Sequence, residues 1–116
     1  MLTGILIDVE NLEVKEVKFK DKLEEYYKLL KCRCITAPSF DECHDLIADD
    51  EGLLKGPTTF FQIGDIEIAG NALIVGVTET GNWKSHSLNF EEIKQKTTFH
   101  TYFRINNVVV KMPLSE

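Results

Sequence analysis

Apolar and polar positions alternate along most of this chain, and the alternation predicts a fold built mainly of strands. Ala72 to Thr78 is apolar on both faces, which is typical of a strand at the centre of a sheet. Near the start, Gly4 to Val9 and Leu12 to Phe19 flank a short turn and predict a β-hairpin. The other predicted strands are Cys32 to Ala37, Thr58 to Ile63, Ile66 to Ile68 and Trp83 to Ser87.

Two segments have the period of a helix instead. The main helix is predicted at Lys22 to Lys31, with Asp21 as N-cap and Glu24 completing a capping box. A shorter helix is predicted at about residues 90–96, where Asn89 and Glu92 form a second capping box. The side chains expected to pack the main helix on the sheet are Leu23, Tyr26, Tyr27 and Leu30, and those expected to form a hydrophobic staple on the second are Leu88 and Ile93.

The end of the chain predicts a β-hairpin at residues 99–112. Phe99 to Ile105 and Val108 to Met112 are joined by Asn106-Asn107, a pair that tolerates the positive φ of a tight turn. With the other elements, this hairpin predicts a single small α+β domain over residues 1–116. Its sheet is expected to be twisted and mostly antiparallel or mixed.

Charge changes this picture in one respect. The net charge is −6, but residues 84–116 carry five basic and three acidic side chains, whereas residues 1–83 carry eight basic and sixteen acidic ones. An acidic total argues against general nucleic-acid binding, which needs Lys and Arg against phosphates. Six carboxylates lie in Asp41 to Glu51, which we interpret as a solvated rim around one buried strand.

The longest apolar run, Ala72 to Val77, is far shorter than the roughly 20 residues of a membrane-spanning helix, so we expect no membrane span. The first residues lack the cationic leader of a signal peptide. The expected location is therefore the cytoplasm. In that reducing compartment we expect free thiols at Cys32, Cys34 and Cys43.

No motif predicts catalysis or a metal site. The three cysteines with His44 lack the tight pairs of a zinc site, and Asp8, Asp49 and Asp50 remain an open possibility for Mg²⁺. Gly76 to Ser85 resembles a phosphate-binding loop but has no helix after it. Neighbouring pairs such as Cys43-His44 and Ser85-His86 point to opposite faces of a strand and cannot form a nucleophile and base. We expect no cofactor.

The glycine-containing segments Ala48 to Gly56 and Gly64 to Gly76 resemble a domain-of-unknown-function family. Its members are small proteins of bacteriophages and mobile elements, chiefly of Gram-positive bacteria. The resemblance covers about residues 3–88, and its motifs are turn glycines and apolar strand residues, so no catalytic residue carries over. It implies an accessory protein that blocks a host factor or sequesters a nucleotide signal of host defence. The hairpin from Phe99 onward lies outside the similar region.

The candidate ligand-binding residues lie in the basic third of the chain. His100, Tyr102 and Arg104 share one face of the predicted hairpin, where a ring can stack on a base and a guanidinium can bind phosphate. Lys84 and His86 share a face of a neighbouring predicted strand.

These residues favour a non-catalytic anti-defence protein that binds and sequesters an anionic small molecule such as a nucleotide. Two alternatives stay open. One is a protein-protein inhibitor that blocks a host defence protein through an acidic or sheet-edge surface, and the other is a nucleotide hydrolase. Edge strands also make a homodimer or higher homo-oligomer a reasonable expectation.

Overall fold

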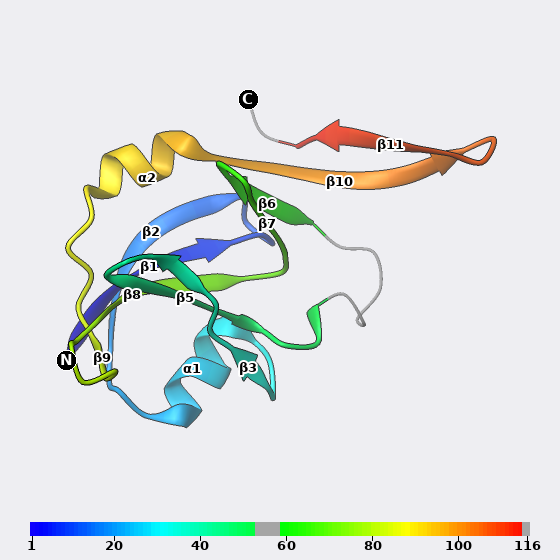
Figure 1. Ribbon diagram of the computed structural model, residues 1–116. Coiled ribbons are helices and arrows are strands. Elements are labelled where there is room, and N and C mark those ends of the chain that lie inside the picture. Colours follow the sequence, from blue (N-terminus) through cyan, green and yellow to red (C-terminus); the bar gives the residue numbers. More distant parts are fainter. Residues whose placement is uncertain (53–58, 115–116) are drawn as a thin grey trace.

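A computed structural model describes residues 1–52 and 59–114 (Figure 1). Every strand pairing in this part of the chain is antiparallel. The two helices are α1 (Leu23–Leu30) and α2 (Phe90–Lys96). The strands are β1 (Leu2–Asp8), β2 (Glu13–Phe19), β3 (Ile35–Thr36), β4 (Ser39–Asp41), β5 (His44–Asp49), β6 (Phe60–Ile63), β7 (Ile66–Ala69), β8 (Ala72–Val77), β9 (Trp83–Lys84), β10 (Thr97–Ile105) and β11 (Val108–Pro113).

The strands form two sheets instead of the single sheet that the sequence predicts. The larger sheet has the order β2-β1-β8-β5-β3, with β4 paired to β5 and β9 paired to β8. The smaller sheet has the order β11-β10-β6-β7. The fold is thus α+β and mostly antiparallel, as predicted, and β8 is central to the larger sheet. No local sequence pattern indicates that β6, β7, β10 and β11 form a sheet separate from the first.

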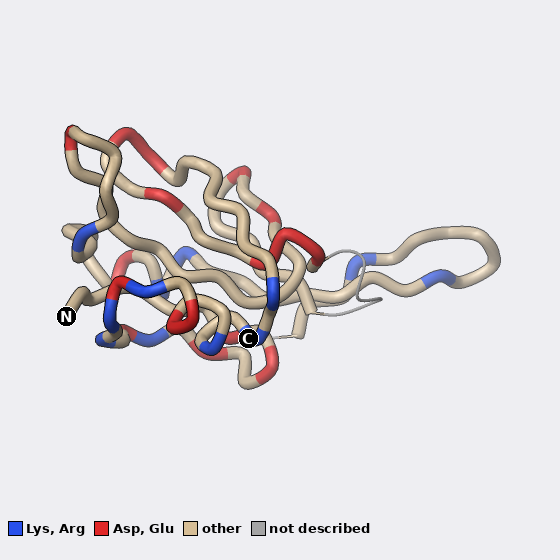
Figure 2. The backbone as a smooth tube through the Cα atoms, turned by 90° about the horizontal axis from the view of Figure 1, so that it is seen from below, with Lys and Arg blue, Asp and Glu red and all other residues tan. Residues whose placement is uncertain are grey.

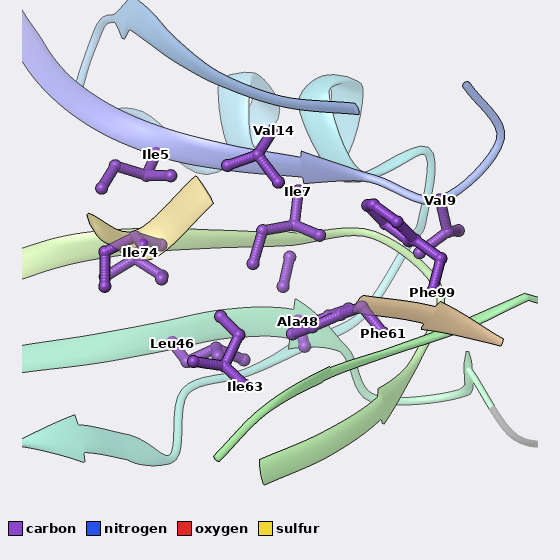
Figure 3. Packing of buried hydrophobic residues seen from close by; sticks show 12 residues of the cluster. Ile5, Ile7, Val9, Val14, Leu46, Ala48, Phe61, Ile63, Ile74 and Phe99 are labelled. Atoms are coloured by element: carbon purple, nitrogen blue, oxygen red, sulfur yellow. The ribbon is translucent and has the colours of Figure 1, made fainter. Parts of the chain in front are cut away.

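The main core lies between the two sheets. Side chains of β1, β5 and β8 meet side chains of β6, β10 and α2 there, and they exclude solvent together (Figure 3). The largest of these residues are Ile5, Ile7, Leu46, Ile74, Phe61, Ile63, Ile93 and Phe99. This packing attaches the start of β10 to the body of the protein.

Helix α1 covers the other face of the larger sheet (Figure 1). Alternate residues of the central strands point to it, so that Leu73 faces α1 while its neighbour Ile74 faces the second sheet. The same alternation explains why β8 is apolar on both faces. The residues around Tyr26 and Leu30 form this second cluster.

The start of α1 differs from the predicted capping box. Lys22 is the N-cap and makes no side-chain cap bond, while Asp21 accepts a hydrogen bond of 2.6 Å from the Tyr26 hydroxyl. Tyr26 and Leu30 are buried as predicted, and Tyr27 is half-buried. Leu23 is 52% exposed, contrary to the prediction, because it opens the helix one turn before the first buried residue.

Two predicted strands are shorter than the sequence pattern indicates. β3 contains only Ile35–Thr36, and β9 contains only Trp83–Lys84. After β9 the chain turns toward β1, where Ser85 accepts from the Thr3 backbone and the His86 backbone donates to Thr3. The predicted strand at Thr58 to Ile63 is β6, and Thr58 lies outside the described residues.

The predicted N-cap of α2 and the predicted turn after β8 are both confirmed. Asn89 caps α2, because its side-chain oxygen accepts a hydrogen bond of 3.0 Å from the Glu92 backbone N–H. Leu88 and Ile93 both pack in the main core between the sheets. The glycine-containing segment after β8 is a hairpin turn closed by a bond from Thr78 N–H to the carbonyl of Asn82. No helix follows it, which agrees with the interpretation that it is not a phosphate loop.

The α1 packing predicts a contrast between two leucines. Leu30→Ala should lower the free energy of unfolding by about 2–5 kcal/mol, because Leu30 is buried against the sheet. Leu23→Ala should change it by less than about 0.5 kcal/mol, because that side chain is mostly in solvent. Urea denaturation measures both. Equal losses would show that the helix packs differently.

Candidate functional site

The C-terminal hairpin projects from the body beyond the first residues of β10. We call residues 101–113, which comprise the end of β10, the turn and β11, the arm (Figure 1). Residues 97–100 of β10 pair with β6, whereas residues beyond 100 pair only with β11. Asn106 and Asn107 have φ angles of 50° and 68°, as a two-residue hairpin turn requires. The predicted hairpin is therefore confirmed, and its register holds along the whole arm.

One side of the arm is apolar and exposed. It continues the core-facing alternation of β10 past Phe99, which is buried, to side chains that are exposed or, at Val110, half-buried. Ile105 is 52% exposed and Val108 is 59% exposed. We call this surface the apolar side, and it consists of Phe103, Ile105, Val108, Val110 and Met112.

The opposite side of the arm carries its charge, which is basic, together with the exposed Val109. Residues 97–114 include Arg104 and Lys111 but no Asp or Glu, although the whole protein has a net charge of −6. Figure 2 shows the two basic positions on the projecting hairpin and the acidic positions on the body. The arm therefore differs from the body in both polarity and charge.

The base of the arm is held by a cluster that we call the anchor: Phe60, Glu67, His100 and Tyr102. The Glu67 carboxylate accepts hydrogen bonds from the Tyr102 hydroxyl and from His100 Nε2, the latter at 2.5 Å. The His100 ring stacks on Phe60 with centroids 5.7 Å apart, and Tyr102 meets both rings edge-on. Strands β6, β7 and β10 are thereby tied together at one point.

These contacts change the acidity of the anchor. The hydrogen bond from Tyr102, reinforced by the one from His100 and opposed by partial burial, holds the pKa of Glu67 below its ordinary value. The same hydrogen bond raises the pKa of the Tyr102 hydroxyl. Glu67 is thus held as a carboxylate and Tyr102 as a neutral donor.

The predicted ligand trio shares one strand face, but it is not jointly accessible. His100 is only 1% exposed, and His100 and Tyr102 both donate to Glu67. An anionic ligand would therefore have to compete with a carboxylate already in place. Arg104 is exposed, and no described residue forms an ion pair with it.

The second predicted pair is also divided. His86 Nε2 lies 2.7 Å from a carboxylate oxygen of Glu16, and its Nδ1 accepts from the Leu88 backbone. This imidazole therefore fixes the segment between β9 and α2. Lys84 is exposed on β9, and within the described residues no ion pair involves it.

The sequence did not indicate the partners of the buried histidines. His44 Nδ1 is 2.8 Å from Asp41, and its Nε2 is 3.1 Å from the Ser87 backbone nitrogen and 3.3 Å from Ser87 Oγ. The order of Asp41, His44 and Ser87 is that of a hydrolase triad. However, the Ser87 N–H already donates to the single lone pair of Nε2, which a nucleophilic serine would need. The row therefore serves to attach the loop before α2 to β5.

Asp8, one of the three candidate Mg²⁺ ligands, has a structural partner set. Its carboxylate accepts from the backbone N–H groups of Glu10 and Asn11 and from the Asn11 side chain, so it closes the turn between β1 and β2. Across residues 1–52 and 59–114, no three His, Cys, Asp or Glu side chains gather as a metal site would require. In the same ranges, no helix is long and apolar enough to cross a membrane.

Comparison with known proteins gives one family. Residues 2–100 match the Domain of unknown function (DUF3846). The chain belongs to the DUF3846 family. The matched region includes α2 and the start of β10, so it extends further than the resemblance read from the sequence, and it ends where the arm begins. No curated protein and no solved structure matches the chain.

The anchor predicts a pH-dependent contribution to the stability of this DUF3846 domain. Because the folded-state pKa of Glu67 is lowered, its ionised form stabilises the fold above the ordinary carboxyl pKa, and this stabilisation is lost as the pH falls through the lowered value. Glu67→Gln should therefore lower the melting temperature at neutral pH. The difference from the wild type should shrink as the pH falls below the ordinary carboxyl pKa, and it should disappear once the pH lies below the lowered pKa of Glu67.

Melting curves recorded across this pH range measure the effect. Glu79→Gln is the matched control, because Glu79 is an exposed carboxylate in the turn after β8. A Glu67→Gln deficit that stays constant from neutral to acid pH would contradict the proposed role of the charge.

Proposed function

We propose that this DUF3846 protein is a non-catalytic binding protein that contacts a partner protein through the apolar side of its arm. One observation supports the proposal: Phe103, Ile105, Val108 and Met112 are exposed together on an element that leaves the body. Contiguous exposed apolar surface is unfavourable in water and commonly marks an interaction site.

The construction of the arm favours binding. Its strands are paired in a fixed register and joined by a tight turn, so little conformational entropy is lost when a partner orders it. Arg104 and Lys111 lie on the opposite face of the same two strands, so the charge of the arm is basic. This charge favours a partner protein whose surface is acidic near the arm.

The resemblance to small phage and mobile-element proteins of Gram-positive bacteria suggests the class of partner. An accessory protein of this kind would act in the host cytoplasm by blocking a host defence protein. The arm lies beyond the residues that match the family. We propose that the body, which matches the family, presents the arm and that the arm selects the partner.

The proposal predicts loss of partner capture when the apolar side becomes polar. The double variant Phe103→Ser/Ile105→Ser should retain no protein from a lysate of a Gram-positive host that the wild type retains, because the apolar contact is removed. Leu23→Ser is the control, since it also replaces an exposed leucine but on α1. Affinity purification with mass spectrometry compares the three proteins. Equal capture by all three would contradict the proposal.

Anion binding is a second candidate, and the guanidinium of Arg104, which pairs with no carboxylate among residues 1–52 and 59–114, favours it. The Arg104 side chain is exposed on an arm that carries no acidic residue. Tyr102 and Arg104 occupy one side of β10, so a nucleotide phosphate could bind Arg104 while Tyr102 borders it.

This candidate predicts that a nucleotide raises the melting temperature of the wild type and not of Arg104→Ala. A charge-assisted hydrogen bond contributes about 1.5–3 kcal/mol, which corresponds to roughly tenfold or more in affinity. The melting temperature without nucleotide should be nearly unchanged, because Arg104 is exposed. A nucleotide panel measured by thermal shift tests it. No shift at millimolar concentration would remove this candidate and leave partner binding.

A further inference from the structure

Strand β11 is the free edge of the smaller sheet, since the order is β11-β10-β6-β7. Ile105 and Val108 close the two-residue turn, so the alternation of the ladder directs the main-chain groups of Val108, Val110 and Met112 toward β10. The N–H and C=O groups of Val109 and Lys111 then point outward. Pro113, which has no N–H, falls at an outward position and ends this edge.

Pro113 protects only the end of this edge, and the rest lacks the usual lysine guard. Proteins commonly guard an edge strand with a lysine whose charge discourages another strand. Here Lys111 Nζ donates to Gln62 Oε1 at 2.8 Å, so its side chain lies back across β10 toward β6. No described residue pairs with the outward main-chain groups of Val109 and Lys111, so they are open to a further strand.

We propose that β11 pairs with β11 of a second copy of this chain, antiparallel and about a two-fold axis at Val110. In this register Val109 faces Lys111 of the second copy, and each such pair exchanges both outward main-chain hydrogen bonds. No two lysines lie directly opposite each other, so the arrangement avoids like charges in one cross-strand pair. The edge is therefore complementary to itself.

The small size of the apolar side favours a second copy of the chain as the partner of β11. The apolar side of one arm has five residues, whereas a stable interface takes roughly 20–30 residues from each partner. In the two-fold pairing Val110 meets Val110 on one face, so the apolar sides of both arms form a continuous surface of twice the size. This inference rests on the proposed function, because the joined surface is the one that would contact the partner protein. The edge contact alone is small, so the dimer should be weak and concentration-dependent.

Sedimentation velocity of the purified protein over a range of concentrations tests the pairing. The wild type should pass from monomer to dimer between about 10 μM and 1 mM, as expected for an interface of this size. Val109→Pro removes an outward N–H and no bond to β10, so the dimer dissociation constant should rise at least about tenfold. Phe103→Ser changes the apolar side and not the edge, so it should still dimerise.

Amide hydrogen exchange of the wild type tests the same pairing without the Val109→Pro substitution, which could disturb the hairpin itself. In the wild type, the Val109 and Lys111 amides should exchange more slowly at high protein concentration, while the already bonded Val110 amide should change little. A monomer at every concentration, or Val109 exchange that is independent of concentration, overturns the edge pairing. If Phe103→Ser abolishes partner capture while the wild type is monomeric, the proposed function stands and this inference fails.

Discussion

Strand β10 has nine residues, but only its first four pair with β6 of the body, so the remaining five extend into solvent. This constraint on β10 determines the shape of the protein, which measures 50 × 29 × 23 Å along its principal axes. Phe99 is buried between the sheets, and the anchor fixes the next residue, His100, on the opposite face. The same strand therefore belongs to the core at one end and to the arm at the other. A rigid connection of this kind presents the exposed side chains in a fixed direction.

Glu67 has a central part in that connection. Its carboxylate draws His100 and Tyr102 together and occupies the position that a ligand anion would take. His100 and Tyr102, two of the three residues predicted to bind a ligand, therefore hold the base of the arm to the body instead. What remains exposed beyond them is mainly apolar, with Arg104 and Lys111 on the face opposite the apolar side. The physical character of the arm thus favours a protein surface over a small molecule.

Local pattern was sufficient for the elements that depend on local chemistry. The double alternation of β8, the Asn89 cap and the Asn106-Asn107 turn all follow from backbone preferences and hydrogen bonding within a few residues. The anchor depends on a contact between residues 33 positions apart, and no local signal joins Glu67 to His100. The burial of His100 was therefore missed, as was the division of the strands into two sheets. Leu23 was misplaced because periodicity does not show where a covering layer ends.

The central claim is that the arm is a formed hairpin whose apolar side stands clear of the body. Nuclear Overhauser effects between assigned side chains test it most directly, in dilute solution where the chain is monomeric. The structure predicts cross-strand effects between Phe103 and Val110 and between Ile105 and Val108, and none from these side chains to core residues such as Ile74. Effects that join Phe103 or Ile105 to the core would show that the arm folds back onto the body, and they would contradict the account.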